Sequence, residues 1–316
     1  MKKLIVLFLA ATVLSCSSED RGNQEVVSSV ETSAPILEGK VLSFKNEKSF
    51  VKEYSELSTL NKEQLQNWIS DKKVIALLNT SSDSLAMQED VIPQARLIYS
   101  DALKSILNAE SKVKIGGKTL WLNERSFYLL QESEVNKSSR ELIGVKDKLE
   151  VYGQLLGMSD PGKKITGKGL IPNENMSKTF ISAEMGVYGT RHRHVVDIFN
   201  ETIYFNGGVQ TSKMYLRSTM QYRSCSSLRC TWKENFNART LTTNFHCAAC
   251  EQVSGRYVWS LKSNIPTTEV TGSQTYLLAE WQFVVPLANP HWNFAISGSI
   301  TCTVVEHPMP VDVSWY

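Results

Sequence analysis

From Phe180 to its C-terminus, the sequence is a succession of short strand-like segments with no helical pattern between them. Turn signals such as Asn206-Gly207-Gly208 separate several of these segments. Many short strands without intervening helices bury their apolar faces by packing as two antiparallel sheets. Residues 180–316 are therefore predicted to form an antiparallel β-sandwich. Its expected strands are Phe180 to Val187, His194 to Phe199, Met214 to Arg223, Cys230 to Phe236, Arg239 to Cys247, Gly255 to Leu261, Thr275 to Val285 and Asn293 to Val305.

The preceding part of the chain has apolar side chains at helical spacing rather than in alternation. This spacing runs from Phe50 to Leu57, and Asn61 with Gln64 then matches the capping box that begins many helices. The chain is long enough for two modest domains. The predicted fold class is α+β, with a mainly helical domain that includes a small hairpin at 39–160, a linker at 161–179 and the sandwich at 180–316.

The small hairpin is predicted from Val113 to Leu122, where Gly116-Gly117 forms the turn. With the residues before it, this segment resembles a module of surface lipoproteins from gut and oral bacteroidetes, in which a pattern like Leu107-Asn108 ends a helix before an apolar strand. The resemblance covers residues 40–130 and implies a fold and a location. It implies no activity, because these family members have none assigned. Its other matching positions are Leu42, Phe44, Phe50, Leu57, Leu65 and Trp68.

The N-terminus has the pattern of a signal peptide. Lys2 and Lys3 precede an apolar run from Leu4 to Leu14 that is too short to span a bilayer. The run ends in Leu14-Ser15-Cys16, which resembles the lipobox of bacterial lipoproteins; a plain secretory signal with an incidental cysteine is the alternative. The resemblance implies a lipid on Cys16 that anchors the protein to a membrane. Residues 1–15 are then the signal peptide, and residues 16–38 are a flexible tether.

The start of the tether indicates the side of the membrane. Ser17-Ser18-Glu19-Asp20 resembles the surface-export signal of bacteroidete lipoproteins, which implies the outer face of the outer membrane. An ordinary acidic tether is the alternative. Two of the 34 Lys and Arg residues precede the cleavage site, so 32 remain to balance the 32 Asp and Glu residues. A net charge near zero gives no long-range attraction to nucleic acid, so nucleic acid is not an expected partner.

Five of the six cysteines lie in the last third of the chain, where an exported protein usually forms disulfides. The segments Cys230 to Phe236 and Arg239 to His246 are predicted to pair as a hairpin that turns near Asn237-Ala238. This pairing would stabilise the root of the hairpin with two nested bridges, each by roughly 2–4 kcal/mol. The expected disulfides are Cys225–Cys250 and Cys230–Cys247.

The same four thiols offer other interpretations. They could form a structural zinc site with His246 nearby, although an exported chain usually meets oxidant before zinc. A redox-active Cys247-x-x-Cys250 lacks the βαβ context that such motifs need. Cys302 is left over and is expected to be a free, buried cysteine that acts as a small hydrophobic residue.

Two histidines open one of the expected strands in the run Arg191-His192-Arg193-His194. On a strand, His192 and His194 point to the same face, so they could share a metal or bind an anion with the arginines. A solvated entry to the strand is the plainer interpretation. Because the sequence places no third ligand beside them, no metal and no cofactor are predicted.

Catalytic signatures are missing from the sequence. Gly162-x4-Gly167-Lys168 begins like a phosphate-binding loop, but Gly169 replaces the hydroxyl residue that would hold magnesium. There is no G-x-S-x-G elbow and no H-E-x-x-H helix. Most C-terminal tryptophans are expected in the core, although one exposed aromatic side chain beside a carboxylate would suffice for carbohydrate binding. These tryptophans are Trp232, Trp259, Trp281, Trp292 and Trp315.

The sequence therefore favours a non-enzymatic binding or interaction module. Its anchor and tether would display it on the outer membrane, where a glycan or an envelope protein is the expected partner. Two alternatives stay open. A hydrolase of extracellular polysaccharide or peptide would need a cleft with two carboxylates or with a carboxylate and a histidine. A structural subunit of a surface assembly would need a flat apolar patch for its partner.

Overall fold

A computed structural model describes residues 34–80, 87–88, 98–156, 177–187, 189–205, 208–227, 230–253, 256–263, 267–287, 292–304 and 311–315. Ser33–Tyr316 form one compact unit. The expected signal peptide, Cys16 and most of the expected tether lie outside the described residues, as does the glycine-rich segment at 162–169. Among the described residues, no helix has the length and apolar character needed to cross a membrane.

Several helices of the described residues begin with side-chain caps, and one of these caps is predicted from the sequence. The capping box at Asn61 is confirmed, because Gln64 N donates to Asn61 Oδ1 and Asn61 N donates to Gln64 Oε1, both at 2.9 Å. Asn46 caps the preceding helix in the same way with Ser49. The helices are α1 (Glu47–Leu57), α2 (Lys62–Lys72), α3 (Leu77–Thr80), α4 (Asp101–Ile106), α5 (Ser139–Ile143) and the 3-10 helix η1 (Lys146–Lys148).

Strands accompany these helices throughout the N-terminal half. The predicted hairpin is confirmed, with Ile115 paired to Lys118 across a turn in which Gly116 and Gly117 have φ angles of 57° and 79°. Positive φ is a conformation that glycine adopts at little cost. The strands of this half are β1 (Ile36–Glu38), β2 (Val41–Phe44), β3 (Met87–Gln88), β4 (Lys112–Ile115), β5 (Lys118–Asn123), β6 (Ser126–Leu129) and β7 (Glu150–Leu156).

The C-terminal half is made of strands, and several are much longer than the sequence predicts. The first group is β8 (Ser177–Ile181), β9 (Met185–Val187), β10 (Thr190–Phe205), β11 (Gly208–Cys225), β12 (Cys230–Glu234) and β16 (Gln274–Leu287). The second group is β13 (Arg239–Val253), β14 (Arg256–Ser263), β15 (Thr268–Val270), β17 (Trp292–Val304) and β18 (Val311–Trp315).

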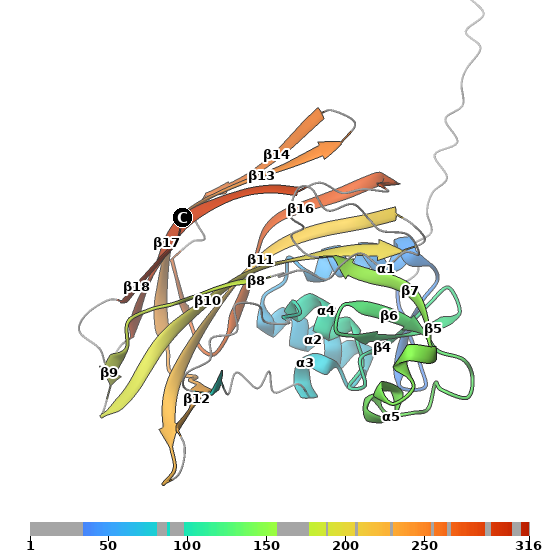
Figure 1. Cartoon of the computed structure of the whole chain (residues 1–316), viewed down its shortest axis with the longest axis horizontal. Coiled ribbons are helices and arrows are strands. Elements are labelled where there is room, and N and C mark those ends of the chain that lie inside the picture. The colour runs from blue at the N-terminus through green and yellow to red at the C-terminus, as the bar shows by residue number, and fades with distance from the viewer. Residues whose placement is uncertain are drawn as a thin grey trace, which may run out of the picture. The chain divides into compact units, whose positions relative to one another are not determined.

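Two sheets contain these strands. The larger one has 13 strands among the described residues, in the order β1-β2-β4-β5-β6-β7-β10-β11-β12-β3, with β8 and β9 also on β10 and β16 also on β11. It is mixed, because β2 and β4 are parallel. The smaller sheet has the order β14-β13-β17-β18, with β15 on β13. Figure 1 shows the helices α2, α3 and α4 grouped beside β4, β5 and β6.

The predicted fold class is wrong, because the protein is mostly β and its large mixed sheet includes strands from both halves of the chain. The two halves join where β7 pairs antiparallel with β10, from Thr202 opposite Leu156 to Phe205 opposite Gly153. There is therefore no separate helical domain followed by a sandwich. Glu150–Leu156 lies among polar, turn-forming residues, and it pairs with β6 on one side and with the distant β10 on the other, so its place in the sheet is not visible locally.

The hydrophobic core has two main clusters. One lies between the helices and the large sheet, and in it the Phe205 ring centroid is 5.2 Å from that of Phe127 and 5.9 Å from that of Phe50. The other lies between the two sheets, where Val196 and Leu216 of the large sheet pack with Leu241, Ile300 and Val313 of the small one. The end of β10 thus belongs to the N-terminal core, while its middle belongs to the C-terminal core.

Candidate functional site

An open groove lies where β10, β11 and β12 approach the loop that follows β12. It has a volume of about 850 Å³, part of which is open solvent. We name it the β12 groove and define it by the residues that line it: Thr190, His192, Tyr222, Glu234, Asn235, Phe236 and Asn237.

Strand pairing positions two of the aromatic rings in the β12 groove. His192 on β10 is directly opposite Tyr222 on β11, and their ring centroids are 6.4 Å apart. His192 Nδ1 lies 3.1 Å from the Thr190 carbonyl oxygen. Because a carbonyl oxygen only accepts, Nδ1 carries the proton, and in the neutral ring Nε2 is then the basic nitrogen.

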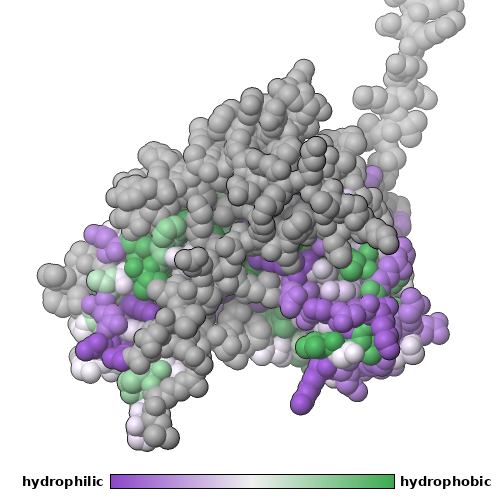
Figure 2. All heavy atoms as spheres, in the orientation of Figure 1, coloured by the Kyte–Doolittle hydropathy of each residue, from purple (hydrophilic) through white to green (hydrophobic). Residues whose placement is uncertain are grey.

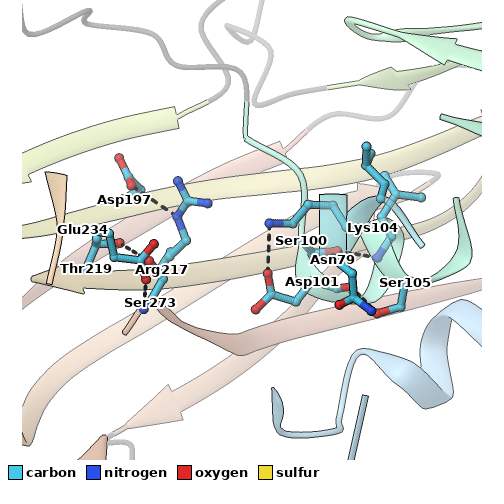
Figure 3. A network of polar contacts seen from close by, with 12 residues as sticks. Asn79, Ser100, Asp101, Lys104, Ser105, Asp197, Arg217, Thr219, Glu234 and Ser273 are labelled. Carbon is cyan, nitrogen blue, oxygen red and sulfur yellow. Dashed lines mark hydrogen bonds and ion pairs between the residues drawn. The ribbon is translucent and has the colours of Figure 1, made fainter. Parts of the chain in front are cut away.

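A turn behind the β12 groove holds Glu234 in place. The Ser273 backbone N–H donates to Glu234 Oε1 at 2.6 Å, and the Ser273 hydroxyl lies 3.0 Å from the Thr219 hydroxyl. Figure 3 shows these three side chains close together, with the ion pair between Asp197 and Arg217 next to them. The carboxylate of Glu234 is therefore held by a backbone N–H of a turn that Thr219 in turn holds.

Gly272 lets Glu234 and Phe236 approach this turn. It has a φ of 60°, and a Cβ atom there would lie 3.0 Å from the Phe236 ring and 3.1 Å from Glu234 Oε1. The Phe236 side chain nevertheless remains 64% exposed. The loop is shaped by Asn235, whose Oδ1 accepts a hydrogen bond from Asn237 N at 2.6 Å in an Asx turn. The result is an exposed aromatic ring beside a fixed carboxylate.

The two histidines singled out by the sequence have different environments. His192 lines the β12 groove, whereas His194 is fully buried with Nε2 2.7 Å from Ser218 Oγ. Burial, together with the charge of Arg239, lowers the pKa of His194 to about 3. The described residues contain no group of three His, Cys, Asp or Glu side chains able to hold a metal ion.

The predicted disulfide connectivity is wrong. Cys225 is bonded to Cys230, because β12 pairs with β11 and places these two residues opposite each other. The expected hairpin of 230–236 with 239–246 does not form, since β13 pairs instead with β14, β15 and β17. Trp232 explains the preference: it is 1% exposed, and the Arg193 guanidinium lies 4.1 Å from its ring centroid.

The other cysteine predictions have different outcomes. Cys302 is free and fully buried as predicted, and burial raises its pKa to about 11. The side chains of His246, Cys247 and Cys250 lie outside the described ones. The zinc interpretation required four thiols, and in this structure the sulfurs of Cys225 and Cys230 are bonded to each other.

A buried polar group that sequence reasoning missed lies between the helices and the large sheet. We name it the Glu201 cluster and define it as Tyr54, Ser58, Ser100, Glu201 and Tyr215. Glu201 Oε2 accepts from the Tyr54 hydroxyl at 2.5 Å and from Ser100 Oγ at 2.7 Å, and Oε1 accepts from Ser100 N at 2.5 Å. The Tyr215 hydroxyl lies 2.9 Å from both the Tyr54 and the Ser58 hydroxyls.

Burial dominates the electrostatics of the Glu201 cluster. It raises the pKa of Glu201, although the hydrogen bonds from Tyr54 and Ser100 act in the opposite direction. The pKa of Tyr54 and of Tyr215 is also raised well above the usual value, first by burial and then by the Glu201 charge. One sequence signal could have revealed the cluster: Glu201 alternates with Phe199 and Ile203, so it lies on the apolar face of its strand.

The Glu201 cluster connects structural elements rather than forming an open reaction site. A small pocket of about 310 Å³ reaches Ser58, Ser100 and Tyr215, but Glu201 itself does not line it. The carboxylate therefore joins the start of α4 and the end of α1 to β10 and β11. Its chemistry is that of a buried, hydrogen-bonded anchor.

The large exposed hydrophobic side chains of the described residues come from several elements. Figure 2 shows hydrophilic residues interspersed with separate hydrophobic patches on the visible described part. Apart from Phe236, the largest exposed hydrophobic side chains are on different elements: Ile36 on β1, Ile75 before α3 and Ile143 on α5.

Comparisons with known proteins identify no activity. No protein-family model matches the sequence, and no curated protein matches it. Among solved structures, the chain is similar to the crystal structure of a DUF4848 family protein from Bacteroides thetaiotaomicron, with 11% sequence identity and a TM-score of 0.22. The similarity covers 87% of this chain and 96% of that chain. This match to a bacteroidete protein is weak, and it carries no argument about the site.

Proposed function

We propose that this protein is a surface-displayed binding module and that the β12 groove holds its ligand. The proposed anchor is a lipid on Cys16 at the outer face of the outer membrane. The tether predicted at 16–38 would then end before β1, which occupies Ile36–Glu38. The lipobox-like and export-signal-like patterns support this location. The groove supports a binding role, because an open concavity with a few positioned polar groups is the usual form of a ligand site.

Carbohydrate is the ligand class that the β12 groove fits best. The single observation that carries this proposal is the 64% exposed ring of Phe236, held next to the Glu234 carboxylate. An exposed ring offers an apolar face for the C–H side of a sugar, and the Asn235 and Asn237 amides with Glu234 offer hydrogen bonds to its hydroxyls. A purely apolar ligand would leave these polar groups without hydrogen-bond partners.

The ligand proposal is tested with Phe236→Ala. The soluble chain of residues 17–316, prepared in an oxidising compartment, is run in native gels containing neutral polysaccharides. We expect retardation of the wild-type protein by at least one of them and about tenfold weaker binding by the variant, a loss of about 1.4 kcal/mol. Ile75→Ala is the matched control, because it removes an apolar side chain that is 67% exposed outside the groove. Equal binding by both variants would refute the role of the groove.

The location is tested independently with Cys16→Ala in a bacteroidete host. We expect the wild-type protein to incorporate radioactive fatty acid and to be cleaved by protease added to intact cells. The variant should incorporate no label. Labelled protein that resists external protease would place the anchor on the periplasmic side and would contradict surface display.

A hydrolase is a second candidate, because the β12 groove contains a carboxylate and a histidine. Glu234 is held by Ser273, and the His192 ring has its basic nitrogen set by the Thr190 carbonyl. These are the groups that general acid–base hydrolysis uses. Release of reducing ends from a bound polysaccharide, lost in both Glu234→Gln and His192→Asn, would favour this candidate over pure binding.

A further inference from the structure

We propose that the β12 groove selects carbohydrates that carry a protonated amino group, and that Glu234 is the residue that makes the selection. This inference rests on the proposed function and deepens it, by naming the ligand's charge. The groove lining carries one acidic side chain, that of Glu234, and no Lys or Arg among its seven residues.

Two of the neighbouring arginines have partners outside the groove. The Arg191 guanidinium forms an ion pair with Glu184 at 3.1 Å, and the Arg193 guanidinium lies over the Trp232 ring with its Nε donating to Gln221 Oε1. Neither residue lines the groove.

Arg239 also lies near Glu234, but it is fully buried, and its Nη2 donates to the Gly272 carbonyl. Lys233 is exposed opposite Tyr222 and does not line the groove. The charge of the lining residues themselves is therefore negative, which disfavours uronic acids and sulfated sugars and favours a cationic group.

The Glu234 carboxylate is held ready for such a group. Its Oε1 is fixed by the Ser273 N–H at 2.6 Å, and Ser273 is in turn fixed by Thr219 at 3.0 Å. A carboxylate held by its surroundings loses little side-chain entropy when a ligand binds. An ammonium group on the ligand would form a charge-assisted hydrogen bond with this carboxylate, which is about twice as strong as a neutral one.

The Phe236 ring next to the carboxylate is the second contributor to the proposed selectivity. Phe236 and Glu234 both lie against Gly272, so the ring and the carboxylate are close enough to contact one small ligand. A sugar ring over Phe236 therefore has its substituents within the field of Glu234. An aromatic face also attracts cations directly, which adds to the preference for an ammonium group.

The experiment compares hexamers of glucosamine and of N-acetylglucosamine, which differ in the charge at one substituent per ring. Binding to the full 17–316 chain is measured by calorimetry at low ionic strength. We expect the glucosamine hexamer to bind about tenfold more tightly to the wild-type protein. Glu234→Gln should abolish this preference, because Gln has no charge, although it retains an oxygen that can accept from Ser273 N.

Glu269→Gln is the matched control, because it removes the same charge from an exposed strand position outside the groove. It should leave the tenfold preference intact. Equal binding of both hexamers by the wild-type protein would overturn this inference and leave the proposed carbohydrate binding standing. Tighter binding of a lysine hexapeptide than of the glucosamine hexamer would overturn it in favour of a peptide ligand. Absence of binding to any sugar would overturn both proposals.

Discussion

Glu201 is a carboxyl group that the fold keeps entirely out of water, with three hydrogen bonds to its two oxygens. A buried acid is stable when its surroundings satisfy it or when it takes up a proton. The hydroxyls of Tyr54 and Ser100 can reverse their donor and acceptor roles, whereas the Ser100 N–H can only donate. The cluster therefore requires a hydrogen-bond acceptor at the place of Glu201 Oε1, which faces Ser100 N. It tolerates a donor at the place of Oε2, which faces the two hydroxyls.

Substitutions of Glu201 separate the charge from the hydrogen bonds. Glu201→Ala leaves the Ser100 N–H unpaired and opens a cavity, so we expect a loss of roughly 3 kcal/mol in the free energy of unfolding. Glu201→Gln should cost much less, because its oxygen can accept from Ser100 N and its amide can donate to the hydroxyls. Urea unfolding at pH 7 measures both. A loss in Glu201→Gln as large as that in Glu201→Ala would show that the charge itself stabilises the fold.

The Glu201 variants also test how the stability of the fold depends on pH. The folded-state pKa of Glu201 is raised above 4.5, so the folded protein holds its proton more tightly than the unfolded chain does. Its contribution to stability is therefore present below about pH 4.5 and is lost as the pH rises through the folded-state pKa. Because Gln does not titrate, Glu201→Gln should not lose stability as the pH rises through this pKa. The stability difference between the variant and the wild-type protein should consequently change with pH in this window.

His194 gives the opposite pH dependence. Its pKa is about 3 in the folded protein against 6.5 ordinarily, so the unfolded chain binds a proton that the folded protein excludes. Stability should fall as the pH decreases from 6.5 toward 3, by about 1.4 kcal/mol per pH unit from this residue. Urea unfolding of the wild-type protein and of His194→Gln, repeated at pH 7.5, 6 and 5, checks this. A difference that does not vary with pH would contradict it.

At the scale of elements, the contact between β7 and β10 joins the two halves of the chain. Gly153 makes it possible, because a Cβ atom there would lie 2.2 Å from the Phe205 ring and 2.6 Å from the Tyr204 carbonyl oxygen. Such distances force a shift of the backbone. The strand that links the halves thus depends on the absence of one side chain.

Gly153→Ala should therefore destabilise the protein by about 1–3 kcal/mol, the usual range for overpacking a tight site. Gly186→Ala is the matched control, since Gly186 also lies on a strand paired with β10 but a Cβ atom there meets nothing within 4 Å. Urea midpoints of the two variants give the comparison. Equal urea midpoints of the two variants would mean that the close approach of β7 to β10 at Gly153 does not contribute to stability.

At the scale of the whole molecule, one large sheet and two cores that meet along β10 make residues 34–315 a cooperative unit. Calorimetry of the 17–316 chain should show a single unfolding transition, and residues 180–316 alone should not fold, because the end of β10 would expose Phe199, Ile203 and Phe205. Two separate transitions, or a folded 180–316 fragment, would restore the two-domain organisation that the sequence predicts.

Local features of this protein follow from its sequence. The capping box at Asn61 and the hairpin at Gly116-Gly117 depend on side chains and φ angles within a few residues of each other, so their patterns predict them. The buried state of Cys302 likewise follows from its alternation with Ile300 and Val304 on one face of its strand. The open groove could not be predicted in this way, since its residues come from 190–192, 222 and 234–237 and only strand pairing brings them together.

The tertiary structure alone decided which strands pair. The segment at 230–234 had two possible partners, and burial of Trp232 under Arg193 goes with pairing to β11, which also determines the Cys225–Cys230 bond. Strand β7 finds β10 about fifty residues later through packing around Phe205. The physical reason is that every strand presents the same backbone hydrogen-bonding groups, so the choice of partner depends on side-chain packing between distant segments.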